Sequence, residues 1–255
     1  MNKRPTILTI AGHDPTGGAG IQADIETINS LGGHTCSIIT SLTAQDSRNL
    51  YSFEPVSADL IRRQFKLLLN DFDIRAIKTG MIGSCEILET LAELLLQLPD
   101  IPLVVDPVLA AGGGSSVSDS EFVATFKKQL LPLATLATPN TSEARILSGQ
   151  QSAEDCAHAL LAAGCKNILI TGTHGDEVDV VNRLYQEDGK NLFIESQRLP
   201  GTYHGSGCTL ASAISFYLAS EHSLTNSLKL AQDYTINTLI NADKPGQGQA
   251  FPVRR

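Results

Sequence analysis

Short apolar runs alternate along this chain with longer stretches whose apolar residues recur at helical spacing. The runs at residues 7–11, 101–105 and 168–170 are typical of buried strands, and residues 21–31 place an apolar side chain at every third or fourth position. Strands that alternate with helices form βα units, which build a mostly parallel sheet. The sequence therefore predicts an α/β fold. Because no linker, internal repeat or low-complexity tract divides it, we expect residues 1–255 to form a single domain.

The charge and hydropathy of the chain argue against several classes of partner. The formal net charge is -8, and no run of Lys or Arg forms a basic stripe, so we expect no nucleic-acid partner. No apolar segment approaches the roughly 18 residues that a membrane span needs, so we expect no membrane partner. The five cysteines are odd in number and lack the spacing of a zinc or redox motif, which favours the reducing cytoplasm.

Polar residues follow several of the predicted strands. Asp106 follows the apolar run at residues 101–105, and Asn140 comes shortly after the run at residues 136–138. Thr171 and Gly172 follow the run at residues 168–170. In α/β sheets, ligands bind beyond the carboxyl ends of the strands. The sequence therefore predicts a ligand site that contains these residues. Further on, residues 178–184 and 191–194 flank an Asp-Gly turn and predict an antiparallel hairpin.

The segment His204-Gly205-Ser206-Gly207-Cys208-Thr209-Leu210 leads directly into an apolar helical stretch. Its two glycines allow a tight turn and a close backbone approach, so that several amide groups at the start of the helix could point at one anion. The same pattern also occurs where a glycine-rich turn merely starts a helix. With an unfavourable overall charge, an anionic substrate would depend on such amides, on single cations or on a metal ion.

Six segments, in order over nearly the whole chain, resemble hydroxymethylpyrimidine/phosphomethylpyrimidine kinases. They are Ala11-Gly12-His13-Asp14-Pro15-Thr16-Gly17-Gly18-Ala19-Gly20-Ile21-Gln22-Ala23-Asp24, Thr43-Ala44-Gln45, Lys78-Thr79-Gly80-Met81, Val105-Asp106-Pro107-Val108, Thr138-Pro139-Asn140-Thr141-Ser142-Glu143 and the segment at 204–210. That family is ribokinase-like. The resemblance implies a three-layer α/β/α sandwich with a mostly parallel central sheet, and ATP and Mg²⁺ as cofactors.

The resemblance also implies an activity, which is the ATP-dependent phosphorylation of the hydroxymethyl group of 4-amino-5-hydroxymethyl-2-methylpyrimidine in thiamine biosynthesis. Phosphorylation of the monophosphate of this alcohol stays open as a second reaction. Two alternatives also remain open: a pyridoxal or pyridoxine kinase of the same fold, and a pyrimidine-binding relative without catalysis. The partners are then ATP and a small pyrimidine, and we expect a homodimer, although no sequence pattern dictates it.

The implied phosphoryl-transfer residues are Gly205, Ser206, Gly207 and Cys208. Cys208 stands where sugar kinases of the superfamily carry an aspartate base. Because thiols at helix N-termini have lowered pKa values, we expect a lowered pKa for Cys208 and a role toward the substrate hydroxyl, against the alternative of a packing cysteine.

The implied Mg²⁺ carboxylates are Asp106 and Glu143, acting mainly through bound water. Asn140 and Glu143 form an N-x-x-E element and, with Thr171 and Gly172, are expected on the nucleotide side. The same Asn and Glu spacing also fits a helix cap.

For the acceptor, the carboxamide of Gln45 offers a donor and an acceptor side by side, and the family uses this glutamine on the aminopyrimidine edge. Gly12 and Asp24 would add polar contacts, with Met81 and Val108 as apolar walls. Gln45 together with Met81 favours a pyrimidine over pyridoxal.

Two lysines that the family usually carries are missing, at Thr171-Gly172-Thr173-His174 and at Gly201-Thr202-Tyr203-His204. Fewer positive charges should weaken the binding of the monophosphate more than that of the neutral alcohol. The glycines of residues 111–116 fit either a lid over the site or an ordinary surface loop.

Overall fold

The computed structural model describes residues 4–111, 115–116, 119–172 and 179–255, and these contain a nine-stranded sheet. Its strands are β1 (Thr6–His13), β2 (His34–Gln45), β3 (Leu50–Pro55), β4 (Ile74–Thr79), β5 (Leu103–Val105), β8 (Leu136–Ala137), β9 (Asn167–Ile170), β10 (Asp179–Gln186) and β11 (Leu192–Gln197). A separate pair, β6 (Ala110–Ala111) and β7 (Ser115–Ser116), is antiparallel. Residues 112–114 and 173–178, which include part of the suggested lid and Thr173-His174, lie outside the described residues.

The sheet has the strand order β11-β10-β9-β8-β5-β4-β1-β2-β3. All neighbours from β9 across to β2 pair in parallel, whereas β3 at one edge and β10 with β11 at the other are antiparallel. The prediction of a mostly parallel sheet is therefore confirmed. The predicted hairpin is β10 with β11; Val178 lies outside the described residues, and β10 continues to Gln186.

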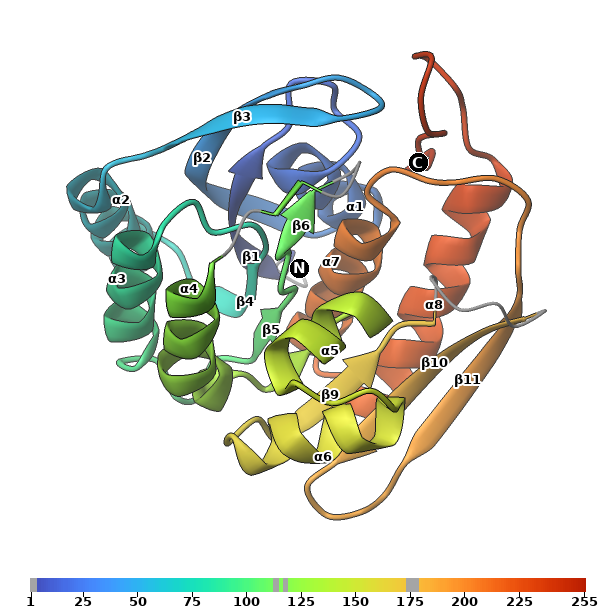
Figure 1. Cartoon of the computed structure of the whole chain (residues 1–255). Coiled ribbons are helices and arrows are strands. Elements are labelled where there is room, and N and C mark those ends of the chain that lie inside the picture. The colour runs from blue at the N-terminus through green and yellow to red at the C-terminus, as the bar shows by residue number, and fades with distance from the viewer. Residues whose placement is uncertain (1–3, 112–114, 117–118, 173–178) are drawn as a thin grey trace.

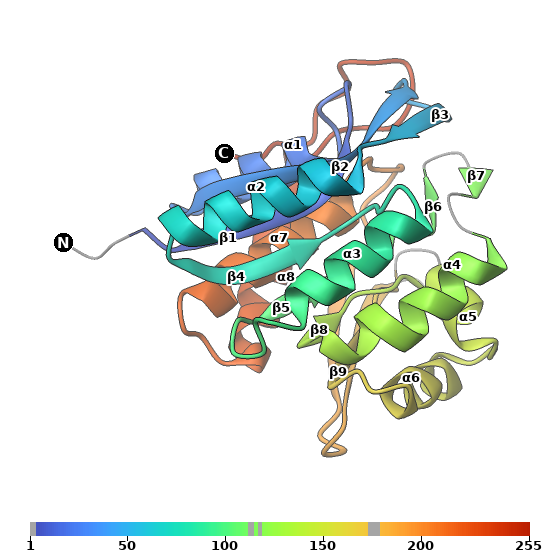
Figure 2. The same cartoon turned by 90° about the vertical axis from the view of Figure 1, so that its left-hand side faces the viewer.

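Helices cover both faces of the sheet. They are α1 (Gly20–Ser30), α2 (Ala58–Asp71), α3 (Cys85–Leu95), α4 (Ser120–Thr125), α5 (Thr141–Ser148), α6 (Ala153–Ala162), α7 (Ser206–Ala219) and α8 (Leu224–Ile240). In Figure 1 and Figure 2, α1, α7 and α8 lie on one face, and α2 to α6 lie on the other. The structure is thus the expected three-layer sandwich.

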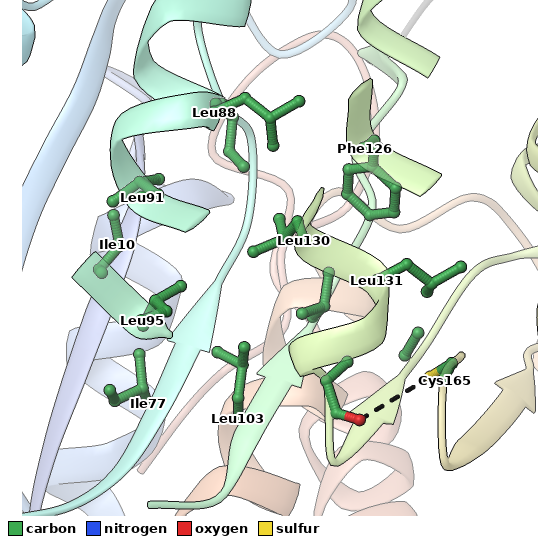
Figure 3. Close-up of a cluster of buried hydrophobic side chains, with 14 of the residues drawn as sticks. Ile10, Ile77, Leu88, Leu91, Leu95, Leu103, Phe126, Leu130, Leu131 and Cys165 are labelled. Carbon is green, nitrogen blue, oxygen red and sulfur yellow. Dashed lines mark hydrogen bonds between the residues drawn. The ribbon is translucent and has the colours of Figure 1, made fainter. Parts of the chain in front are cut away.

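The core under α3 shows why the local pattern predicts the helix. Figure 3 shows Leu88, Leu91 and Leu95, which recur at helical spacing along α3, in the same buried cluster as Ile77 of β4 and Leu103 of β5. Burying each such side chain contributes roughly 1.5–3 kcal/mol. On the opposite face, α7 contacts α1, α8, β4 and β5, and most of its residues are buried. The start of α7 is therefore held firmly against the sheet.

The strand connections reverse direction between β1 and β4, and we refer to the sheet edge at the carboxyl ends of these strands as the crevice. These two strands are parallel neighbours, but α1, which follows β1, lies on one face of the sheet, and α3, which follows β4, lies on the other. Loops that leave adjacent strands in opposite directions open a crevice between them, and α/β sheets bind ligands there. In Figure 2, β4 points toward the side where β3 and β6 lie. The residues predicted for the site follow strands that end on that side.

Candidate active site

A hydrogen-bonded loop follows β1 at this crevice and is centred on Asp14. The Asp14 carboxylate accepts hydrogen bonds from the amides of Thr16 and Ala19, each at 2.8 Å, and its Oδ2 lies 2.8 Å from Nε2 of His204. The side chain of Gln45 lies close enough to Asp14 to help lower its pKa. Burial on its own would raise the pKa of Asp14, but these hydrogen bonds, with that of His204 first, hold it well below its usual range. Asp14 therefore ties the β1 loop to the segment that starts α7.

The start of α7 packs directly against this loop. Gly205 is the N-cap residue and has a φ of 77°, in the left-handed region that favours glycine. A Cβ at Gly205 would lie 2.0 Å from the carbonyl oxygen of Gly18, so the two backbones meet with no room for a side chain. A Cβ at Gly207 would meet no atom within 4 Å. Since amides in the first turn of a helix have no partner within it, Ser206, Gly207 and Cys208 form a backbone cradle that can receive an anion.

Cys208 is a neutral thiol in this arrangement. Its side chain is buried and lies close enough to Lys78 and Asp106 for their charges to act on its pKa. Loss of water around the thiolate raises the pKa of Cys208 to about 12, although the charge of Lys78 acts in the opposite direction. The predicted lowering of this pKa is therefore wrong. The effect of the helix terminus is outweighed by burial, together with the negative charges of Asp106 and Asp24.

Behind Cys208 lies a buried ion pair of Lys78 and Asp24, and both side chains have no exposed surface. Lys78 Nζ lies 2.9 and 3.0 Å from the two carboxylate oxygens of Asp24. Asp24 also accepts hydrogen bonds from Ser212, at 2.7 Å, and from Thr9. The Asp24 carboxylate is therefore enclosed by protein groups, and its contact with the substrate stays a prediction. Its role is to hold Lys78.

Lys78 is the residue of this cluster to which the sequence motifs assigned no role. Its Nζ lies 3.9 Å from Oδ2 of Asp106, so it places a positive charge beside the candidate metal ligand. Burial alone would lower the pKa of Lys78, but neighbouring negative charge, with that of Asp24 first, keeps it above its usual value. The available signal was a lysine directly after the apolar pair Ala76-Ile77 of a predicted strand, since lysine is almost never fully buried unless it is paired.

Asp106 and Glu143 are two buried carboxylates at the ends of neighbouring elements. Burial raises the pKa of Asp106, and it raises that of Glu143 to about 8, with the charge of Asp106 adding to the effect. Oδ2 of Asp106 accepts no hydrogen bond from the described residues. A cation between two repelling carboxylates would lower both pKa values, so the pair fits Mg²⁺. The described residues contain no cluster of three or more candidate metal ligands, so water and phosphate would complete such a site.

The Asn140 and Glu143 pair also forms a complete helix cap. Oδ1 of Asn140 accepts the Glu143 amide, and Oε2 of Glu143 accepts the Asn140 amide, each at 2.9 Å. Glu143 thus caps α5, and the same carboxylate also lies near enough to Asp106 to feel its charge. Asn140 pairs with Thr171 in a parallel bridge, and Gly172 follows directly. The structure therefore brings together all four residues predicted for the nucleotide side.

The residues predicted for the acceptor surround the other end of the crevice. Half-buried Gln45 lies near His204 and Gln249 at this end. A Cβ at Gly12 would lie 3.3 Å from Sδ of Met81, so these two residues pack closely. The amide of Val108 donates to the carbonyl oxygen of Asp106 at 2.9 Å. Apart from Asp24, the predicted acceptor residues follow or end strands that meet at this edge.

A family model agrees with this geometry. The sequence model described as phosphomethylpyrimidine kinase matches residues 14–254. The chain belongs to the phosphomethylpyrimidine kinase family. It is therefore a kinase, and its cradle and carboxylates are the parts that a phosphotransferase needs.

Relatives within this family extend over nearly the whole chain. The hydroxymethylpyrimidine/phosphomethylpyrimidine kinase of Streptomyces coelicolor is 38% identical, and the match covers 98% of this chain and 93% of that protein. The protein of the same name from Escherichia coli is 34% identical, with coverages of 94% and 93%. The family assignment therefore rests on sequence similarity over nearly the whole chain, which includes the residues at both ends of the crevice.

Solved structures show the same fold. An ADP complex of Bacillus subtilis pyridoxal kinase has a TM-score of 0.89 at 29% identity, covering 99% of this chain and 98% of that one. Phosphomethylpyrimidine kinase from Clostridium difficile has a TM-score of 0.80 at 34% identity, covering 92% and 100%. The ribokinase-like fold is thus shared by kinases named for two different substrates, pyridoxal and phosphomethylpyrimidine.

Proposed function

We propose that the chain transfers the γ-phosphoryl group of ATP to the hydroxymethyl group of 4-amino-5-hydroxymethyl-2-methylpyrimidine, in thiamine biosynthesis. One observation carries the proposal. The anion cradle of α7, the Cys208 thiol and Asp106 lie at the carboxyl-end edge of the sheet, where Gln45 ends β2 close to Asp14. A donor of phosphoryl groups and a flat polar acceptor can therefore bind side by side, with the cradle between them.

On the nucleotide side, Asn140, Glu143, Thr171 and Gly172 would position ATP so that its γ-phosphoryl group enters the cradle. Solved structures of related pyridoxal kinases with ADP and with AMP-PCP support ATP as the donor. Phosphoryl transfer passes through a loose transition state whose charge lies on the transferred oxygens. The backbone amides of residues 206–208 would stabilise that charge, and pre-positioned donors of this kind supply much of the catalysis.

Asp106 and Glu143 would hold Mg²⁺, mainly through water, beside the phosphates. When bound, the ion neutralises phosphate charge. The orphaned Oδ2 of Asp106 and the mutual repulsion of the two carboxylates support this assignment. Lys78, paired with Asp24, would keep the Asp106 carboxylate ionised and fix its position from the buried side.

On the acceptor side, Gln45 would pair with the aminopyrimidine edge, and Gly12, Met81 and Val108 would line the ring. The neutral Cys208 thiol would lie against the reacting hydroxyl and orient it toward the cradle. Little proton removal is needed before a metaphosphate-like state forms, so a weak proton acceptor suffices.

Replacing Cys208 tests its position on the reaction path. We expect Cys208→Ala to lower kcat by about 10- to 100-fold, at the low end of the contribution of a positioned proton-transfer group. Cys208→Ser, which keeps a hydroxyl that can reach Asp106 and the alcohol, should retain more activity. Steady-state kinetics for both variants, with Cys165→Ala as a control at a buried thiol outside the crevice, provide the measurement. Near-normal kcat in Cys208→Ala would assign the thiol to packing alone.

The monophosphate is proposed as the poorer substrate. The sequence lacks two lysines of the family, although Nη2 of Arg198 donates to the carbonyl oxygen of Gly172 at 3.3 Å and so brings one guanidinium to the nucleotide side. A substrate that already carries a phosphate would still meet fewer cations here than in the usual family pattern.

Pyridoxal is the second candidate acceptor, and the TM-score of 0.89 with a pyridoxal kinase favours testing it directly. The decisive experiment is product analysis with Mg-ATP and each alcohol at equal concentration, resolving mono- from diphosphate. We expect pyrimidine monophosphate as the main product, loss of turnover with EDTA, and recovery with excess Mg²⁺. Faster phosphorylation of pyridoxal would reverse the choice of substrate. Binding of the pyrimidine without turnover would support the non-catalytic alternative. The homodimer and the cytoplasmic location stay predictions.

A further inference from the structure

Arg254 is buried beside the active-site loops although it lies in the segment that follows α8. Its side chain is 1% exposed. Its guanidinium makes three polar contacts: Nε donates to Oγ1 of Thr209 at 2.8 Å, Nη2 donates to the carbonyl oxygen of Gly18 at 2.6 Å, and Nη1 lies 3.0 Å from Oε2 of Glu26. A buried arginine is costly unless its donors are satisfied, and its planar fork can grip several acceptors at once. The acceptors here belong to the loop that follows β1, to α1 and to the first turn of α7.

The first acceptor belongs to a peptide unit that is held at both ends. Arg254 binds the carbonyl oxygen of Gly18, while the amide of Ala19, in the same planar peptide unit, donates to Oδ2 of Asp14 at 2.8 Å. Because carbonyl and amide point in opposite directions across a trans peptide, two such contacts prevent the unit from rotating. Gly205 packs against this unit, at a distance that leaves no space for a Cβ. The position of Gly205 therefore depends on a surface that Arg254 helps to fix.

The second acceptor acts on the cradle itself. Oγ1 of Thr209 accepts from Arg254 and donates to the carbonyl oxygen of Gly205 at 2.9 Å. The amide of Thr209 donates to the same oxygen, also at 2.9 Å. Holding this carbonyl along the helix directs the amide of Ser206, in the same peptide unit, the opposite way, out of the helix end. Arg254 thus acts on the first amide of the cradle through one hydroxyl.

The backbone that delivers Arg254 is itself anchored beside the site. The amide of His204 donates to the carbonyl oxygen of Ala250 at 2.8 Å, and the rings of His204 and Phe251 lie 5.5 Å apart. The amide of Val253 donates to the carbonyl oxygen of Thr238 in α8 at 3.0 Å. The guanidinium therefore approaches from a backbone segment that is anchored to α8 and to the start of α7.

We propose that Arg254 is a positioning residue for phosphoryl transfer: without touching the substrate, it locks the Gly18 peptide and, through Thr209, the Gly205 carbonyl, so that the cradle amides point at the transferred phosphoryl group. This inference rests on the proposed function, since the cradle must act on a phosphoryl group. Its effect falls on the transition state, where misplaced donors cost rate, more than on binding of the neutral alcohol.

The test compares Arg254→Met and Arg254→Lys with Arg255→Met, a control at the exposed neighbouring arginine. We expect Arg254→Met to lower kcat by about 10- to 100-fold, below the loss from removing a cradle donor outright, with the KM for the alcohol within about threefold of wild type. Arg254→Lys keeps the charge but not the fork, so it should recover part of this loss. Arg255→Met should behave as wild type. A folded Arg254→Met enzyme with wild-type kcat, or an equal loss in Arg255→Met, would overturn the proposal.

Two further measurements separate positioning from simple destabilisation. Thr209→Val should lower kcat in the same way, and the double variant with Arg254→Met should lose little more than either single variant, because both break one relay. Additive losses would contradict the relay. If Arg254→Met does not fold, Arg254→Lys replaces it as the test, provided that its Tm equals that of the wild type. A kcat below the wild-type value then supports the proposal, and a wild-type kcat overturns it.

A binding experiment tests the role of Arg254 separately from the proposed function. ADP, Mg²⁺ and fluoroaluminate mimic the transferred group, and calorimetry measures their binding without an alcohol. We expect binding at least about tenfold weaker in Arg254→Met than in Arg255→Met, a change of about 1.4 kcal/mol. If the wild-type enzyme phosphorylates neither alcohol, the proposed function fails, and this comparison alone still supports or overturns the role of Arg254.

Discussion

Lys78→Met is expected to lower the free energy of unfolding by about 3–5 kcal/mol, the usual cost of removing one partner of a buried ion pair. The physical reason is the carboxylate left behind. Asp24 has no exposed surface, and Lys78 Nζ is the cation within 3 Å of both its oxygens. Without the lysine, the donors that remain to the charge among the described residues are the hydroxyls of Thr9 and Ser212. Urea unfolding followed by circular dichroism would give the change in free energy.

Two variants make this prediction specific. Adding Asp24→Asn to Lys78→Met removes the stranded charge and leaves an amide oxygen for Ser212, so the double variant should recover much of the lost stability. Lys190→Met breaks an ion pair of similar length, 2.8 Å to Asp188, but both side chains are largely exposed and no measurable change is expected. If Lys78→Met were as stable as wild type, the buried pair would contribute nothing to this fold.

The local hydrophobic pattern was sufficient for the strands and helices that carry the crevice, because each of them buries a regular apolar face. The same pattern did not predict the strand β3, which contains the exposed Tyr51 and ends at Pro55. An edge strand pairs on one side only and tolerates polar residues and proline, so it carries little apolar signal. It also assigned no element to α6 or α8, whose buried residues include many small or polar side chains.

The motifs located the candidate site, but they could not give the environment of its side chains. Gln45, Asp106 and Cys208 each stand in a segment with a local signature. Whether Asp24 meets a ligand, and whether Cys208 is charged, depends on burial by elements distant in the sequence. Arg254 is the extreme case, since 236 positions separate it from the Gly18 carbonyl that it binds. Such contacts follow from the assembled tertiary structure, and no local spacing encodes them.

Gly205→Ala is expected to lower kcat by about a hundredfold or more, the loss seen when a pre-positioned oxyanion donor is removed. Two costs combine at this position. A residue with a Cβ at a φ of 77° is strained by about 1–2 kcal/mol. In addition, the Cβ would lie 2.0 Å from the Gly18 carbonyl oxygen, so one of the two loops must move. Because Arg254 and Asp14 hold the peptide unit between Gly18 and Ala19 in place, we expect the start of α7, and with it the cradle, to shift instead.

The matched control is Gly189→Ala in the turn between β10 and β11. Gly189 has a φ of 79°, and a Cβ there would meet no atom within 4 Å. This variant therefore carries the same backbone strain without the collision, and it should lose stability while kcat stays at the wild-type value. Steady-state kinetics and thermal unfolding of both variants separate strain from displacement. Equal kcat in Gly205→Ala and wild type would mean that the amides of α7 do not touch the phosphoryl group during transfer, since a shift at the N-cap moves every donor of the first turn.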